Sequence, residues 1–121
     1  MVTASAARTR STAYAPDRGD IVWLDFDPQS GHEQSGKRPA LVISPQSYNA
    51  KTNLALFCPI TSHVKGYPFE VALPTTGKIK GVVLSDQVKS LDWRARYAQF
   101  ITKAAPAVID DVLRKLRSLT G

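Results

Sequence analysis

Two predicted strands each have, at one end, side chains that could act on a phosphodiester. Arg38 precedes the apolar run 40–43, and Thr61 and Ser62 follow the run 53–60. The guanidinium of arginine stays charged at neutral pH and presents a planar fork of donors that fits two phosphate oxygens. A threonine hydroxyl can add a further donor. If the two strands are neighbours in a sheet, Arg38 and Thr61 could together stabilise the negative charge that develops when a phosphodiester is cleaved.

Such a pair needs no nucleophile from the protein if the substrate is RNA. The ribose 2′-OH lies next to the phosphate that it would attack, so the attack is intramolecular. A simpler interpretation stays open on spacing alone. Arg38 would then be a surface ion-pair residue, and Thr61 would be the cap of a loop.

Two other kinds of nuclease site have weaker support. His32 and His63 are the two histidines of the chain, and both fall in predicted loops, from which they could meet as an acid–base pair. Asp20, Asp25 and Asp27 alternate with apolar residues, as surface positions of a strand do, which disfavours a metal site. The sequence has no glycine-rich phosphate loop, serine elbow, CxxC or HExxH motif. We therefore expect neither a metal nor a cofactor.

The elements that must position these side chains are short strands with tight connections. A single helical turn is expected within 46–53, and extended segments are expected at 21–26, 40–43, 53–60, 69–73, 82–84 and 94–102. Only the C-terminus has clear helical spacing, beginning near Pro106, with an apolar face made of Val108, Ile109, Val112, Leu113, Leu116 and Leu119. This pattern predicts a mainly β fold, a small barrel or sandwich, whose core is covered by the C-terminal helix.

Composition limits the class of protein. A length of 121 residues fits one domain, and 16 Lys and Arg against 10 Asp and Glu give a net charge of +6. This charge suits a polyanion such as nucleic acid, an acidic protein or a membrane surface. The single cysteine, Cys58, allows no intrachain disulfide and fits a reducing cytosol. No apolar run is long enough to cross a bilayer, so we expect no membrane association through a spanning segment.

The N-terminus is expected to be a flexible tail, 1–16, ahead of a single domain, 17–121. The tail is rich in Ala, Ser, Thr and Arg but lacks the continuous apolar run of a secretory signal. Its Arg- and Ser-rich, acid-poor composition is also compatible with a transit peptide, which stays the less favoured interpretation. We therefore expect a cytoplasmic protein.

Four segments in this order resemble the MazF/PemK-type toxins of bacterial toxin–antitoxin systems. They are GDIVWLDFDPQSGHEQSGKRPALVISPQSYN, CPIT, KGYPFEV and GVVLSDQVKSLDWRAR, and the resemblance covers nearly all of 17–121. It implies a ribosome-independent, sequence-specific endoribonuclease that cleaves single-stranded RNA. It also implies a small SH3-like β-barrel of the CcdB/MazF type with a C-terminal helix, assembled as a homodimer with an RNA groove across its interface. The expected protein partner is an acidic cognate antitoxin, and the toxin–antitoxin complex would bind operator DNA.

The resemblance also assigns roles to particular residues. Arg38, in the G-x-E-Q-x-G-x-R-P motif, and Thr61 match the catalytic pair of the family, and Glu33 is similar to a loop acid implicated in activity. The implied reaction is metal-independent attack by the 2′-OH, leaving a 2′,3′-cyclic phosphate and a 5′-hydroxyl. Ser62 stands where near relatives often have a second threonine. The candidate RNA-binding residues are His32, Lys37, Ser62, Lys65, Tyr67, Gln87, Lys89, Arg94 and Arg96.

Aromatic side chains could stack on the bases of single-stranded RNA. Tyr67, in a loop between Gly66 and Pro68, is the best candidate. Trp23 and Trp93 lie inside apolar strand patterns, so we expect both to pack in the core.

A second class of function stays open, because a fold does not fix a function. The CcdB toxins are similar in fold but act by trapping DNA gyrase without cleaving RNA. The G-x-E-Q-x-G-x-R-P motif belongs to the ribonuclease branch, so we prefer the endoribonuclease.

Overall fold

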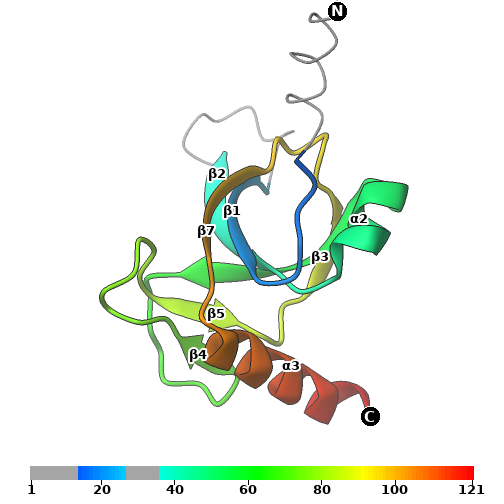
Figure 1. Cartoon of the computed structure of the whole chain (residues 1–121). Helices are drawn as coiled ribbons and strands as arrows, with labels where there is room; N and C mark the ends of the chain where they lie inside the picture. Colours follow the sequence, from blue (N-terminus) through cyan, green and yellow to red (C-terminus); the bar gives the residue numbers. More distant parts are fainter. Residues whose placement is uncertain (1–13, 27–35) are drawn as a thin grey trace, which may run out of the picture.

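The computed structural model describes residues 14–26 and 36–121 of the chain (Figure 1). The helices and strands of this part follow one another as β1 (Asp20–Asp25), β2 (Lys37–Val42), α2 (Gln46–Thr52), β3 (Leu54–Thr61), β4 (Glu70–Ala72), β5 (Val82–Leu84), β6 (Lys89–Asp92), β7 (Gln99–Lys103) and α3 (Pro106–Thr120). Within these ranges, no helix is both long and apolar enough to span a membrane.

The strands form one antiparallel sheet in the order β4-β5-β3-β2-β1-β7, and β6 also pairs with β3. β3 lies at the centre, because its first half pairs with β6, its last two residues pair with β5, and β2 pairs along its middle. The sheet curves strongly, with α3 lying beside β4 and β5 (Figure 1). The predicted mainly β fold with a C-terminal helix is confirmed, although the sheet is open, with β4 and β7 as its end strands in the described part of the chain.

The core consists of two clusters, one on each face of β3. Successive side chains of a strand point to opposite faces. Cys58 and Ile60 therefore pack in one cluster, and Phe57 packs in the other. Helix α3 adds Val108 and Val112 to the first cluster, each stabilising the fold by roughly 1.5–3 kcal/mol through burial. The predicted role of the C-terminal helix as a cover of the core is confirmed, although its last apolar residue, Leu119, is 50% exposed.

Most strands lie within a residue of their predicted bounds, but β2 begins three residues earlier than expected. β2 begins at Lys37 and not at Ala40, so Arg38 lies inside the strand and not before it. The reason is pairing with β1, whose Leu24 and Asp25 are opposite Arg38 and Lys37. Backbone hydrogen bonds of this ladder extend the strand into a polar segment that has no apolar pattern of its own.

β6 was not predicted from the sequence, and the extended run expected to begin at Arg94 begins instead at Gln99. The polar strand β6 forms because β3 offers it an antiparallel partner. It ends where the Asp92 carboxylate accepts hydrogen bonds from the N–H groups of Arg94 and Ala95, at 3.0 and 2.9 Å. Such a side-chain bond to nearby backbone favours a turn over an extended strand.

The N-terminal end of the described chain is packed against the domain. The Asn49 side chain donates to the carbonyl of the fully buried Pro16 at 2.7 Å, and the Tyr14 hydroxyl donates to Asp20 at 2.9 Å. Burial, together with the bond to Asp20, raises the pKa of Tyr14 well above its usual range. The expected flexible tail therefore stays a prediction for 1–13, which lie outside the described residues.

The two tryptophans differ in their environment. Trp93 is buried and donates its indole N–H to the Asn49 carbonyl at 2.9 Å, which confirms the predicted core position. The prediction for Trp23 was wrong, because this side chain is 37% exposed. Its neighbours Val22 and Leu24 point into the second cluster, so Trp23 lies on the opposite face of β1, where it is not fully covered.

Candidate functional site

The register of β2 and β3 brings Arg38 and Thr61 to the same end of the sheet. Ala40 is opposite Pro59, and Val42 is opposite Phe57. The paired residues of β2 and β3 end at Ala40 and Pro59. Continued by two residues, the same register would set Arg38 across from Thr61, with both side chains on one face of the sheet. The adjacency of the two strands, assumed in the sequence analysis, is confirmed.

The Arg38 side chain is exposed, and its donors have no hydrogen-bond partner among the described residues. No hydrogen bond or ion pair joins this side chain to any residue in 14–26 or 36–121. On its other side, β2 pairs with β1, where Leu24 is fully buried. The backbone of Arg38 is therefore held by its pairing with Leu24 of β1, whereas its donor fork is available to an anion.

The Thr61 hydroxyl is oriented by the turn that follows β3. Its Oγ accepts a hydrogen bond from the His63 backbone N–H at 3.1 Å. A hydroxyl has one proton and two acceptor lone pairs, so this bond leaves the proton free to donate elsewhere. Thr61 is thus a loop cap and a potential donor to a substrate at once.

The backbone of Thr61 is closely approached by Gly81. The φ of Gly81 is +118°, and a Cβ atom added there would lie 2.2 Å from the Thr61 carbonyl oxygen. A contact this short requires the backbone to move. Any residue other than glycine would therefore displace Thr61 and the adjacent Ser62.

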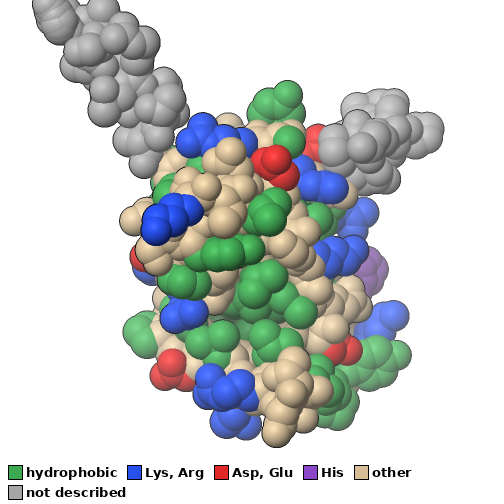
Figure 2. Space-filling view, turned by 90° about the vertical axis from the view of Figure 1, so that its right-hand side faces the viewer, with side chains coloured by type: hydrophobic (Ala, Val, Ile, Leu, Met, Phe, Trp, Pro, Cys, Tyr) green, Lys and Arg blue, Asp and Glu red, His purple; other side chains and the backbone are tan. Residues whose placement is uncertain are grey.

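A pocket of about 450 Å³ opens beside Thr61. It is lined by Thr61, His63, Lys65, Tyr67, Phe69, Glu70, Leu84, Asp86 and Gln87. We call it the β3-end pocket. Figure 2 shows Lys and Arg side chains along the right-hand edge of the molecule, with a histidine among them, so this edge is predominantly basic.

The loop 62–69, which forms one wall of the β3-end pocket, is held by side chains from other elements. The Glu70 carboxylate accepts the backbone N–H groups of Lys65 and Gly66 at 3.1 and 2.9 Å. The ammonium of Lys115, on α3, donates to the Pro68 carbonyl at 2.7 Å. Gly66 has a φ of +82°, which favours glycine. These anchors preorganise the wall that presents Lys65 and Tyr67.

Several candidate RNA-binding residues gather at this end of the sheet. Ser62 is exposed next to Thr61, and Gln87 lines the β3-end pocket. Tyr67 is 61% exposed, and the Lys65 ammonium lies 5.9 Å from the centre of its ring. Lys37, next to Arg38, donates to the Gln99 side chain at 3.2 Å.

Other candidates lie elsewhere or are engaged within the fold. Arg94 donates to the Asn53 side chain at 2.8 Å, just before β3 begins, and so lies at the opposite end of that strand from Thr61. Arg96 donates to the carbonyls of Asp25 and Phe26 at 3.1 and 2.6 Å, and thereby fixes the end of β1.

Among the described residues, one further candidate, Lys89, does not line the β3-end pocket. Lys89 is exposed on β6, opposite Phe57 of β3. His32 and Glu33 lie outside the described residues.

The sequence analysis did not single out Glu70, Gly81 or Asp86. All three lie in or beside the GYPFEV and GVVLSDQ segments, and this position was the one available signal. Their roles depend on contacts across the sheet, which spacing along the chain does not reveal.

The described residues offer few alternative reactive groups. Burial, with a contribution from the negative charge of Asp86, raises the pKa of the Cys58 thiol to about 12. This thiol is therefore protonated at neutral pH and a poor nucleophile. In 14–26 and 36–121, no group of three or more His, Cys, Asp and Glu side chains is arranged to hold a metal ion.

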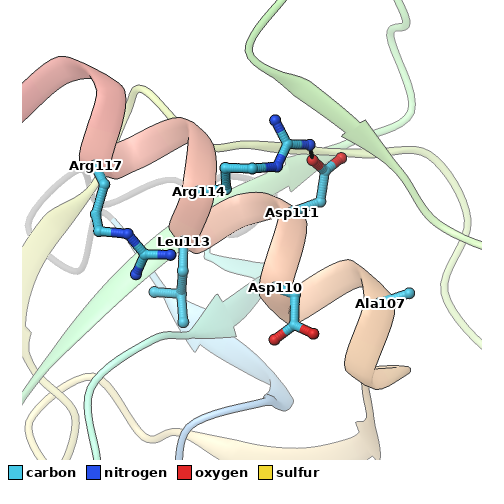
Figure 3. Close-up of a pocket in the computed structure, with 6 residues that line it drawn as sticks. All are labelled: Ala107, Asp110, Asp111, Leu113, Arg114 and Arg117. Carbon is cyan, nitrogen blue, oxygen red and sulfur yellow. Dashed lines mark hydrogen bonds and ion pairs between the residues drawn. The ribbon is translucent and has the colours of Figure 1, made fainter.

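A second hollow, of about 650 Å³, lies along α3 (Figure 3). All of its lining residues come from this helix, and Asp111 forms an ion pair with Arg114. None of the candidate site residues lines it.

The chain matches a known family over most of its length. The family model described as "PemK-like, MazF-like toxin of type II toxin-antitoxin system" matches residues 17–120. The endoribonuclease toxin MazF of Escherichia coli K12 is 49% identical over 108 residues, which cover 89% of this chain and 96% of that protein. The chain belongs to the PemK-like, MazF-like toxins of type II toxin–antitoxin systems, as the sequence resemblance implied.

Solved structures agree with this assignment. A crystal structure of MazF from Deinococcus radiodurans (Form-I) is 55% identical, with a TM-score of 0.81, over 89% of this chain and 98% of that one. A MazE–MazF crystal structure from the same organism (Form-II) is 49% identical, with a TM-score of 0.81, over 89% and 97%. The fold of this chain is therefore that of the MazF toxins.

Proposed function

We propose that this chain is the endoribonuclease toxin of a toxin–antitoxin system and that it cleaves single-stranded RNA at a short sequence. The observation that carries the proposal is that neighbouring strands bring Arg38 and Thr61, each with free donors, to the same end of the sheet, where Thr61 lines a pocket large enough for part of a nucleotide. The family assignment and the endoribonuclease relatives support it. They do not favour the gyrase-binding alternative.

The proposed reaction uses the substrate's own nucleophile. The ribose 2′-oxygen loses its proton and bonds to the adjacent phosphorus, while the bond from phosphorus to the 5′-oxygen breaks and that oxygen takes up a proton. The products are a 2′,3′-cyclic phosphate and a 5′-hydroxyl. Arg38 binds two non-bridging oxygens as their charge increases, and Thr61 donates to one of them. Glu33 is the acid that we propose to act in the same reaction.

The proposed partners of this chain are inferred from its net charge and from its family. A crystal structure of the D. radiodurans relative is of MazE together with MazF. We propose an equivalent acidic antitoxin for this chain, since the toxin carries a net charge of +6. We further propose that the toxin is a cytoplasmic homodimer with its RNA groove across the interface, and that the toxin–antitoxin complex binds operator DNA.

Cleavage of a long mixed-sequence RNA in excess EDTA tests the function. We expect discrete cuts at one short motif, with 5′-hydroxyl ends at every cut. The ends are mapped by sequencing, and their chemistry is tested by phosphorylation with a polynucleotide kinase. An Arg38→Ala preparation purified in parallel controls for a contaminating nuclease. Intact RNA in the presence of folded, antitoxin-free protein that inhibits gyrase would reverse the proposal.

Gly81→Ala is expected to lower the cleavage rate by about 10- to 100-fold, because the added methyl displaces Thr61 from the reacting phosphate. The measurement is the single-turnover rate at saturating enzyme, corrected for the folded fraction. In a Thr61→Ala background, the same substitution is expected to change the rate little, because the group through which it acts is gone.

Gly19→Ala is the matched control for Gly81. Gly19 also has a positive φ, of +95°, but its added Cβ would meet the side chain of Ile109, which can move. We expect this variant to lose stability and to keep the cleavage rate of its folded fraction. Equal rate losses in the two glycine variants would show that Gly81 does not act through Thr61.

A further inference from the structure

The β3-end pocket contains a free carboxylate, which binding of RNA phosphates alone does not explain. Two acids, Glu70 and Asp86, line this pocket. The Glu70 carboxylate is used within the fold, since it accepts two backbone N–H groups of the loop 62–69. The Asp86 side chain is exposed and forms no hydrogen bond or ion pair with any described residue. A free carboxylate repels phosphate, so it is expected to face another part of the RNA.

The rest of the pocket suits a nucleobase. Tyr67 presents an exposed aromatic ring, on which a base can stack. Lys65 lies over that ring and can bind a phosphate flanking the stacked base. Gln87, adjacent to Asp86, adds an amide with both donors and an acceptor. Single-stranded RNA is recognised in this way, by stacking of a base and hydrogen bonds to its edge.

We infer that Asp86 accepts a hydrogen bond from the exocyclic amino group of a nucleobase held in the β3-end pocket, and so restricts one position of the cleavage motif to amino-bearing bases. This inference rests on the proposed endoribonuclease function. Cytosine, adenine and guanine each have such a group. Uracil has none, and two carbonyl oxygens flank its N3–H, so its edge repels the second carboxylate oxygen.

The expected discrimination is substantial because the acceptor is charged. Loss of a hydrogen bond to a charged group, with the acceptor left unpaired in an occupied pocket, lowers kcat/KM by about 10- to 100-fold. Asp86 acts on the base, whereas Arg38 and Thr61 act on the phosphate. Its removal should therefore relax the motif without abolishing cleavage.

The test removes the amino group from the base and the Asp86 carboxylate from the protein, separately and together, and compares the losses in kcat/KM. After the motif is mapped, each amino-bearing base is replaced in a synthetic RNA by its analogue without that group: inosine for guanosine, purine riboside for adenosine, and zebularine for cytidine. At one position we expect the wild-type protein to lose about 10- to 100-fold in kcat/KM. The Asp86→Ala variant should lose less than about threefold at the same position.

Asp110→Ala is the matched control, because Asp110 is an exposed acid on α3 whose removal changes the net charge equally. It should discriminate against the analogue as strongly as the wild type. Asp86→Asn supplies a gain of function, since its amide can donate to a uracil carbonyl and accept from uracil N3–H. This variant is expected to cut RNA with uridine at the restricted position faster than the wild type does, by up to about 10- to 100-fold.

Each result decides between distinct conclusions. Equal losses for the wild type and Asp86→Ala at every analogue would overturn the assignment of Asp86, while the protein would remain an endoribonuclease. A wild-type motif in which no amino group matters would do the same. Absence of all cleavage by folded wild-type protein would overturn the proposed function, and this inference with it.

Discussion

A single 2′-deoxy substitution in the nucleotide on the 5′ side of the cut is expected to stop cleavage of an otherwise intact RNA substrate. The described part of the chain offers no obvious replacement nucleophile: the Cys58 thiol is buried, and its pKa is raised to about 12. The 2′-OH next to the phosphate has an effective concentration of about 10⁵–10⁸ M in favourable geometry, so its removal should leave no measurable rate. The measurement is single-turnover cleavage of a synthetic RNA that contains the mapped motif.

The matched control has the same substitution one nucleotide further from the cut. That RNA keeps its nucleophile, and its cleavage rate should stay within a few-fold of the unmodified substrate. Both RNAs should bind the protein with similar affinity, because phosphate contacts dominate binding and are unchanged. Continued cutting of the first RNA would indicate that water or a protein group attacks the phosphorus, and the proposed mechanism would then be wrong.

The adjacency of the Arg38 and Thr61 strands could be predicted because it depends on short connections. The strands β2 and β3 are separated only by α2 and its flanking residues, and consecutive strands usually lie side by side. Their antiparallel register then places the start of one strand opposite the end of the next. Chemistry at the same end of a sheet was thus foreseeable from residue types and strand order.

Neither strand β6 nor the different contacts of Arg94 and Arg96 could be predicted from the sequence. The residues 89–92 have a polar pattern and form a strand only because β3 is available to pair with them. Arg94 and Arg96 are two residues apart and chemically identical. One binds Asn53 and the other binds carbonyls at the end of β1, since the turn at Asp92 directs them to different elements.

Pocket residues such as Asp86 were also beyond sequence reasoning. An acid in a basic protein is usually interpreted as a solvated surface group, and its spacing from Thr61 suggests no contact. The antiparallel pairing of β3 with β5 brings the start of β5 beside the end of β3, and the segment after β5 runs back alongside β3. The pocket therefore arises from sheet topology and not from a local motif.

Arg38→Ala is expected to lower the rate of the chemical step by about 10²–10³-fold, as is typical for the loss of a donor that stabilises transition-state charge. Because Arg38 is exposed and has no hydrogen-bond partner among the described residues, the free energy of unfolding should change by no more than about 0.5 kcal/mol. Arg38→Lys keeps the charge but loses the planar fork, so it should recover only part of the rate. Single-turnover kinetics and thermal unfolding measure the two effects separately.

Arg94→Ala is the matched control for Arg38, since it also removes one positive charge but at the opposite end of β3. It breaks the hydrogen bond to Asn53 and the contact with the Trp93 ring, 4.8 Å from its centre, so stability should fall while the cleavage rate is kept. Arg38→Ala should therefore lower the cleavage rate without lowering stability, whereas Arg94→Ala should lower stability without lowering the cleavage rate. If Arg38 were a surface ion-pair residue, its removal would leave the rate unchanged, and the donor pair with Thr61 would lose its proposed role.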